Sequence, residues 1–347
     1  MRRCFLHAGG HKTGTSALQH FLLANRGNLR DRGYLVPSAG MRHGSHQQFI
    51  RRVAGLPFAP HAEHCLEQME LELKDSGCDN VILSAEIVET VISQDHNFAN
   101  IIGFLNKIDF EVTIVYYFRN KPQQLTSQYV QRTKTYLLDR NFDRFIASQI
   151  RAVEPFFVKV FDTLSSAGVE TIFRPYNQQA RRSGIARDFL DAIGLAAFGV
   201  QDSVVVNQSI GPVGMEAARR SMQEIDGGLT VLIPAQRTRC KAALFTVLKE
   251  AELVEQPYCG LTTQMARKVE NAYKPDCDEF ARRAWGCSWA DMFSDDVGQQ
   301  FEPNDLTMVR PTEAQQVALE RVLPPLIHRI RTINRDSQQA ESRCGAH

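Results

Sequence analysis

The sequence predicts an α/β fold: a three-layer sandwich in which helices cover both faces of a central parallel sheet, followed by a helical C-terminal extension. Three observations indicate it. Short apolar runs alternate with amphipathic helical patterns through residues 1–205, as is typical of parallel sheets. The apolar runs are continuous, which indicates strands buried on both faces. After residue 205 strand patterns fade and helical patterns take over.

Five segments carry the strand pattern. Residues 81–84 and 112–118 show it most clearly, because their apolar side chains follow one another without the polar alternation of a half-exposed strand. The expected strands are residues 3–7, 34–36, 81–84, 112–118 and 170–174.

Helices are expected where apolar residues recur with a period near 3.6. Pro122 lies two residues after Asn120, which predicts a helix start with an Asn cap. The other expected helices are residues 16–29, 65–73, 186–193, 214–225, 234–253, 277–285 and 311–335. We expect residues 1–205 to form the α/β core, residues 206–335 a helical extension packed on that core, and residues 336–347 a flexible tail.

The composition excludes several classes of protein. Among 347 residues, 40 Lys and Arg nearly balance 39 Asp and Glu, so the formal net charge is +1. Binding to a nucleic-acid backbone needs massed basic residues, so we expect no nucleic-acid partner and only a local anion site. No apolar run reaches the roughly 18 residues of a transmembrane segment. The eight cysteines are scattered without a CxxC pair, which favours reduced thiols and a cytoplasmic location.

The most informative segment is residues 6–19, where an expected strand leads into a glycine-rich turn and an amphipathic helix. Glycines let successive backbone N–H groups point into one concavity, and the helix adds unpaired N–H groups and the positive end of its dipole. Lys12 adds a charge, so the segment has the properties of a phosphate-binding loop. Lys12 precedes Gly14, however, whereas a Walker A loop places its lysine after the last glycine. An ordinary strand-to-helix turn that contains a lysine is the alternative.

The order Lys12-Thr13-Gly14-Thr15-Ser16 at the first strand-to-helix turn resembles the 5′-phosphosulfate loop of the sulfotransferase family. Members of that family use 3′-phosphoadenosine 5′-phosphosulfate (PAPS) as the sulfuryl donor. The resemblance implies a P-loop-type fold and a catalytic Lys12 that stabilises charge on the leaving phosphate. It also implies that the 5′-phosphate is bound by the residues of the loop, which are Gly10, His11, Lys12, Thr13, Gly14, Thr15 and Ser16.

The same family binds the 3′-phosphate of the donor with an Arg at the end of a later strand and a Ser eight residues on. Here Arg119 follows the expected strand 112–118, and Ser127 lies eight residues after it. Arg119 would project from the carboxyl edge of the sheet and Ser127 from the early turns of the next helix, so both can reach one phosphate. Taken singly, each residue fits an ordinary surface position.

The resemblance extends over most of the chain, although its other parts are individually unspecific. It is greatest to bacterial members of the family. The segments that carry it are Asn25-Arg26, Gly33-Tyr34-Leu35-Val36-Pro37, Leu83-Ser84-Ala85-Glu86, Arg174-Pro175-Tyr176 before Asp188-Phe189-Leu190, and Val206-Asn207-Gln208-Ser209.

Sulfuryl transfer also needs a base for the acceptor hydroxyl, and many sulfotransferases use a His or a Glu. Glu86 follows the expected strand 81–84 at its carboxyl end, where open α/β sheets place their sites. His46 lies in a loop after residues 34–36 and has a suitable intrinsic pKa. Glu86 and His46 are therefore the two catalytic candidates. His43 is placed much like His46, and Glu89 is expected to be solvated.

The expected function is in-line transfer of a sulfuryl group from PAPS to an acceptor hydroxyl, without a metal. The resemblance favours a carbohydrate or glycolipid acceptor, while a small phenol, another metabolite or a protein side chain also fits. A P-loop kinase is the main alternative, but kinases hold Mg²⁺ with an Asp at a strand end. The expected strands here lead into Glu86 and Arg119 instead. A non-catalytic nucleotide-binding protein is the other alternative.

Overall fold

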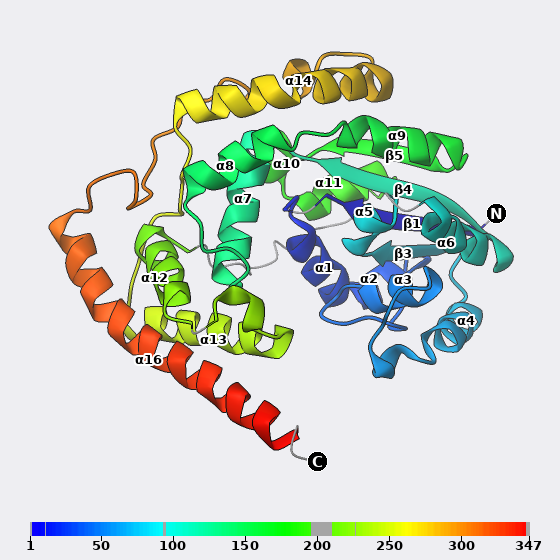
Figure 1. Cartoon of the computed structure of the whole chain (residues 1–347). Coiled ribbons are helices and arrows are strands. Elements are labelled where there is room, and N and C mark those ends of the chain that lie inside the picture. The colour runs from blue at the N-terminus through cyan, green and yellow to red at the C-terminus, as the bar shows by residue number, and fades with distance from the viewer. Residues whose placement is uncertain (1, 11, 93–94, 196–209, 226, 345–347) are drawn as a thin grey trace. The chain divides into compact units, whose positions relative to one another are not determined.

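The computed structural model describes residues 2–10, 12–92, 95–195, 210–225 and 227–344 (Figure 1). The expected boundary between residues 205 and 206 lies outside the described residues. The chain divides into two compact units, which are taken separately below. The first comprises Met1–Asn120, Glu154–Val206 and Tyr273–Val297, and the second comprises Lys121–Val153, Asn207–Ala272 and Gly298–His347.

The sheet of the first unit has five parallel strands in the order β2-β3-β1-β4-β5 (Figure 1). The α/β class and the central parallel sheet are therefore confirmed, and each strand lies where the sequence predicts one. The strands are β1 (Arg2–Gly9), β2 (Tyr34–Leu35), β3 (Asn80–Ser84), β4 (Phe110–Phe118) and β5 (Glu170–Pro175).

Strand β1 lies at the centre of this sheet. It pairs with β3 up to His7 opposite Ser84 and with β4 up to Gly9 opposite Tyr117. Residues 4–9 are all buried, because neighbouring strands cover both edges of β1 and helices cover both of its faces.

Different helices pack on the two faces of the sheet. On one face, Phe5 of β1 and Tyr117 of β4 join a buried cluster with Phe21 and Phe189 of helices α1 and α11. On the other face, the Phe118 ring of β4 lies edge-to-face against Phe157 of α9, with ring centroids 4.8 Å apart. The first unit therefore has three layers. Its helices are α1 (Thr15–Ala24), α2 (Arg26–Arg30), α3 (Gln47–Val53), α4 (Cys65–Ser76), α5 (Ile87–Ile92), α6 (Asp95–Lys107), α9 (Phe156–Ser166), α10 (Gln178–Ser183), α11 (Ile185–Ala192), α15 (Trp289–Met292) and the C-terminal part of α14 (Thr263–Trp285).

The helix expected over residues 16–29 is divided in two. Asn25 separates α1 from α2, and its side-chain amide donates to the carbonyl oxygen of Phe21 at 2.9 Å. An asparagine side chain competes with the backbone for such bonds, which favours a helix end at this position.

The described part of the second unit is helical. An aromatic cluster forms part of its core, in which the Tyr129 ring stacks on Tyr258 and packs edge-to-face on Phe142. Helices occur where the sequence predicts them, but α14 begins before and α16 ends beyond the expected bounds. The helices are α7 (Lys121–Lys134), α8 (Phe142–Arg151), α12 (Pro212–Gln223), α13 (Pro234–Glu250), the N-terminal part of α14 and α16 (Glu313–Cys344).

None of the helices in the described ranges is both long enough and apolar enough to span a membrane.

The N-terminus of α9 is capped by a carboxylate from another helix, which generates a stability prediction. The backbone N–H groups of Phe157 and Val158 each donate to Asp276 of α14 at 2.9 Å. Asp276→Ala leaves these buried donors unpaired, so we expect the free energy of unfolding to fall by about 2 kcal/mol in urea titrations. The control is Asp278→Ala, because Asp278 pairs with Lys274 on the exposed surface of the same helix. Equal losses in both variants would contradict the capping role.

Candidate functional site

The candidate site lies at the carboxyl edge of the sheet, beside β1 and β4. These strands are neighbours, yet the chain leaves β1 toward β2 on one side and leaves β4 toward β5 on the other. Such a reversal opens a crevice at the strand ends, where α/β sheets bind ligands. The glycine-rich loop follows β1 and Arg119 follows β4, and the Gly10 N–H donates to the Tyr117 carbonyl oxygen at 3.2 Å. The fold therefore brings these two segments together.

The loop has the backbone conformation of an anion-binding nest. Lys12 and Gly14 have φ angles of 74° and 82°, and Thr13 between them is not in this left-handed region. Alternation of this kind turns successive N–H groups toward one side. Gly14 is the N-cap of α1, with no side-chain cap bond and no acidic residue in the first turn. The N–H groups of Ala17 and Leu18 donate to the Gly14 carbonyl oxygen, so the N–H groups before them are the ones that can serve another acceptor.

Three polar side-chain atoms converge on the backbone at Gly9. A Cβ atom on Gly9 would lie 2.9 Å from Thr13 Oγ1 and 3.1 Å from both His7 Nε2 and Thr15 Oγ1. Thr13 Oγ1 donates to the Gly10 carbonyl oxygen at 2.7 Å. Within the part of the chain that the structure describes, neither His7 Nε2 nor Thr15 Oγ1 has a hydrogen-bond partner, although both are buried. Only glycine fits at position 9, and two polar atoms beside it need a partner.

Arg119 connects the end of β4 to the loop. Its guanidinium donates to the Lys12 carbonyl oxygen at 2.8 Å and lies 5.8 Å from the centre of the Tyr176 ring. Burial lowers the pKa of Arg119, and nearby Arg181 acts in the same direction; an arginine stays charged nonetheless. Its buried Nε atom has no partner among the described residues. A cation held in this way favours an anionic ligand.

Tyr176 is a site residue that the sequence analysis did not single out for a role. It follows β5, its N–H donates to the Phe118 carbonyl oxygen, and its hydroxyl would lie 2.9 Å from a Cβ on Gly14. The Arg181 guanidinium lies 6.0 Å from the centre of the same ring. Arg181 pairs with the buried carboxylate of Asp296 at 2.6 Å. The advance signals for Tyr176 were its place after an expected strand and its part in a segment that carries the resemblance.

The two carboxylates after β3 have different surroundings. Glu86 is half-buried, and its charge lies close enough to His7 to raise the pKa of that ring against the larger effect of burial. Glu89 was expected to be solvated, but it is buried on α5 and accepts a hydrogen bond from the Tyr116 hydroxyl at 3.0 Å. Its face of α5 packs on the sheet, which sequence spacing did not indicate.

His46 is a buried residue with both ring nitrogens in use. Its Nδ1 accepts from the Ser84 N–H at 3.1 Å, and its Nε2 donates to the Pro37 carbonyl oxygen at 2.9 Å. Burial lowers the pKa of His46 to about 4, so the ring is neutral at pH 7. These bonds tie the segment after β2 to the end of β3. They leave His46 no lone pair for a substrate proton.

The structure thus brings together most of the residues predicted for the donor loop. Gly10, Lys12, Thr13, Gly14, Thr15 and Ser16 are in the first unit with Arg119, whereas Ser127 is on α7 of the second unit. His11 lies outside the described residues. Among the described residues, no group of three or more His, Cys, Asp or Glu side chains is placed to hold a metal ion.

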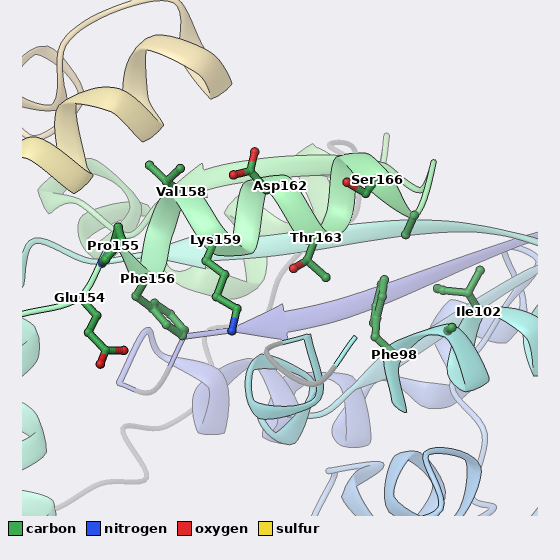
Figure 2. Close-up of a pocket in the computed structure, with 12 residues that line it drawn as sticks. Phe98, Ile102, Glu154, Pro155, Phe156, Val158, Lys159, Asp162, Thr163 and Ser166 are labelled. Atoms are coloured by element: carbon green, nitrogen blue, oxygen red, sulfur yellow. The ribbon is translucent and has the colours of Figure 1, made fainter. Parts of the chain in front are cut away.

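A groove of about 1090 Å³ lies elsewhere in the first unit (Figure 2). It is lined by residues of α6 and α9, with Phe98 and Ile102 from one helix and Lys159 and Asp162 from the other. No residue of the glycine-rich loop lines it. Among the described residues, buried polar atoms without a partner occur at several positions, but those of His7, Thr15 and Arg119 gather at the loop. The loop is therefore the candidate site.

Comparisons of the chain with protein-family models, curated proteins and solved structures found no match. The function of the site is therefore argued from the residues themselves.

The two buried histidines predict a pH-dependent stability. Burial lowers the pKa values of His7 and His46 from 6.5 to about 4 in the folded chain. Between these values the unfolded chain binds more protons, so stability falls as the pH falls from 6.5 to 4. Each histidine contributes a slope of up to about 1.4 kcal/mol per pH unit. Urea unfolding of His46→Gln from pH 7 to 4.5 should show a slope reduced by about that amount; an unchanged slope would contradict the prediction.

Proposed function

We propose that the chain is a sulfotransferase that moves a sulfuryl group from PAPS to an acceptor hydroxyl. The observation that carries the proposal is the hydrogen bond from Arg119 to the Lys12 carbonyl oxygen. It sets a half-buried cation beside a glycine-rich loop at the switch point of a parallel sheet. Two phosphate-binding elements side by side suit a donor with phosphates at both its 5′ and its 3′ positions.

The residues at the loop fit a 5′-phosphate. The N–H groups of the first turn of α1, the Lys12 ammonium group and the buried Thr15 hydroxyl are all suited to phosphate oxygens. The strand order and this loop together support the P-loop-type fold that the sequence analysis expects. Arg119 would bind the 3′-phosphate, and the proposed part of Ser127 in that contact rests on the sequence resemblance.

The chemistry assigns one task to each of two residues. As the acceptor oxygen forms its bond to sulfur and the bond from sulfur to the 5′-phosphate oxygen breaks, Lys12 neutralises the charge that develops on the phosphate. Glu86 accepts the proton of the acceptor hydroxyl, and adenosine 3′,5′-bisphosphate leaves. No metal is required in this scheme.

The proposed acceptor is a hydroxyl on a carbohydrate or glycolipid, and residues 206–335 are proposed to shape its pocket. The acceptor class comes from the family resemblance, whereas the proposed cytoplasmic location comes from the scattered cysteines. The near-neutral chain, with a formal charge of +1, suits a small nucleotide donor whose charge a few local cations can balance.

Calorimetry with two nucleotides tests the proposed function. We expect adenosine 3′,5′-bisphosphate to bind in the absence of metal, because the site supplies its own cations, and ATP with Mg²⁺ to bind at least tenfold more weakly. The opposite preference would support a kinase and contradict the sulfotransferase. Binding of the bisphosphate without sulfuryl transfer to any of a panel of sugar and glycolipid acceptors would support a non-catalytic nucleotide-binding protein.

Two substitutions separate the proposed roles of the cations. Lys12→Ala should lower kcat roughly a hundredfold or more with little change in donor affinity, because Lys12 acts on charge that develops during the reaction. Arg119→Ala should instead weaken donor binding by about 10- to 100-fold, since it removes a charge-assisted contact. Steady-state kinetics and calorimetry measure both effects, and Arg151→Ala on the exposed surface of α8 is the control. Equal effects of both substitutions on kcat and affinity would discredit the assignment.

A further inference from the structure

His7 lies directly beneath the glycine-rich loop and has no part in the scheme above. Its side chain is fully buried on β1, and its ring packs edge-on against Tyr117 and Phe189 with centroids 5.7 and 5.8 Å away. One ring nitrogen, Nδ1, lies 2.8 Å from Ser84 Oγ. The other, Nε2, is buried without a partner among the described residues. A polar atom left unpaired in an apolar site is costly, so its partner is worth seeking.

The bonds around Ser84 allow the tautomer of His7 that carries its hydrogen on Nε2. Gln19 on α1 donates through Nε2 to Ser84 Oγ at 3.3 Å. Ser84 Oγ has two lone pairs, so it can accept from Gln19 and either donate its own hydrogen to His7 Nδ1 or accept a hydrogen from it. When Ser84 donates, the neutral ring carries its hydrogen on Nε2. The ring is neutral because burial lowers the pKa of His7 to about 4, despite the opposing charge of Glu86.

The Nε2 atom of His7 shares its surroundings with the hydroxyls of the loop. His7 Nε2 and Thr15 Oγ1 each lie 3.1 Å from the point that a Cβ on Gly9 would occupy. Thr13 Oγ1 lies 2.9 Å from the same point, and its own hydrogen is donated to the Gly10 carbonyl oxygen. Thr15 is the first residue of α1 and its hydroxyl is unpaired among the described residues. When the ring carries its hydrogen on Nε2, a donor and an unpaired acceptor therefore lie around one small space.

We propose that His7 is a positioning residue for phosphate binding: its Nε2–H donates to Thr15 Oγ1 when the loop is occupied, and this aims the Thr15 hydroxyl hydrogen at an oxygen of the 5′-phosphate. The inference rests on the proposed function, since it concerns the same loop. In this network Gln19 donates to Ser84 and Ser84 donates to His7. His7 in turn donates to Thr15, and Thr15 donates to the phosphate. A hydroxyl oriented by a buried network loses less freedom when the ligand binds.

The ring tautomer tests the network in the ligand-free protein. Long-range ¹H–¹⁵N spectra of the histidine rings at pH 7, with His7→Gln to identify the signal, should show the hydrogen of His7 on Nε2. A hydrogen on Nδ1 would overturn the inference whatever the protein binds.

Matched variants and two nucleotides test the phosphate contact. His7→Gln keeps an N–H group near the position of Nε2, whereas His7→Leu removes it. We expect His7→Leu to weaken binding of adenosine 3′,5′-bisphosphate about tenfold. His7→Gln should weaken it by less than about fivefold. Binding of adenosine 3′-monophosphate, which lacks the 5′-phosphate, should not change in either variant. Phe5→Leu, on the same face of β1, is the control that lowers the Tm without changing either affinity.

The outcomes separate the two proposals. If the wild-type chain does not bind adenosine 3′,5′-bisphosphate, the proposed function fails and the phosphate role of His7 fails with it. If the wild-type chain binds it but His7→Gln and His7→Leu lose affinity equally, or lose affinity for the 3′-monophosphate as well, the role of His7 is structural and the inference alone is overturned.

Discussion

The central position of β1 is the constraint on which the rest of the site depends. The strand is covered by β3 and β4 at its edges and by helices on its faces, so its residues from Cys4 to Gly9 are shielded from water. A polar side chain there must find partners within the protein. His7 meets this condition with Ser84 on one side only, and the loop that leaves β1 supplies the groups around its other nitrogen. Because β1 is buried, the polar groups of the loop are the neighbours of the second His7 ring nitrogen.

The two buried histidines show how tertiary contacts give one residue type two roles. Both rings are shielded from water and have pKa values lowered to about 4. His46 uses both nitrogens on backbone groups and therefore links the segment after β2 to β3. His7 uses one nitrogen on Ser84, and its Nε2 atom beside the loop has no partner among the described residues. The number of ring nitrogens already engaged, rather than burial, separates the linking histidine from the one proposed to position a ligand.

Arg119 places a positive charge at the candidate site of a chain whose formal net charge is only +1. Its guanidinium is held by the Lys12 carbonyl oxygen and the Tyr176 ring, and its pKa is lowered by burial. Holding a cation in this way is unfavourable unless an opposite charge is near. The carboxylate of Asp296 supplies part of that charge and raises the pKa of Arg119, and the proposed phosphate would supply more.

The amino-acid sequence by itself determined the strands, the glycine-rich loop and the place of Arg119, because continuous apolar runs and the residues that end them are local patterns. It did not reveal the helix break at Asn25 or the burial of Glu89. Nor did it place the side chains of His7 and Tyr176 beside the glycine-rich loop. It also did not show that residues 121–153 belong with the C-terminal helices. These depend on contacts between residues distant along the chain, as between Arg119 and Lys12, which are 107 positions apart, and between His7 and Ser84, which are 77 apart. Only the folded sheet brings such pairs within hydrogen-bonding distance, so the tertiary structure alone decided which polar groups were left for a ligand.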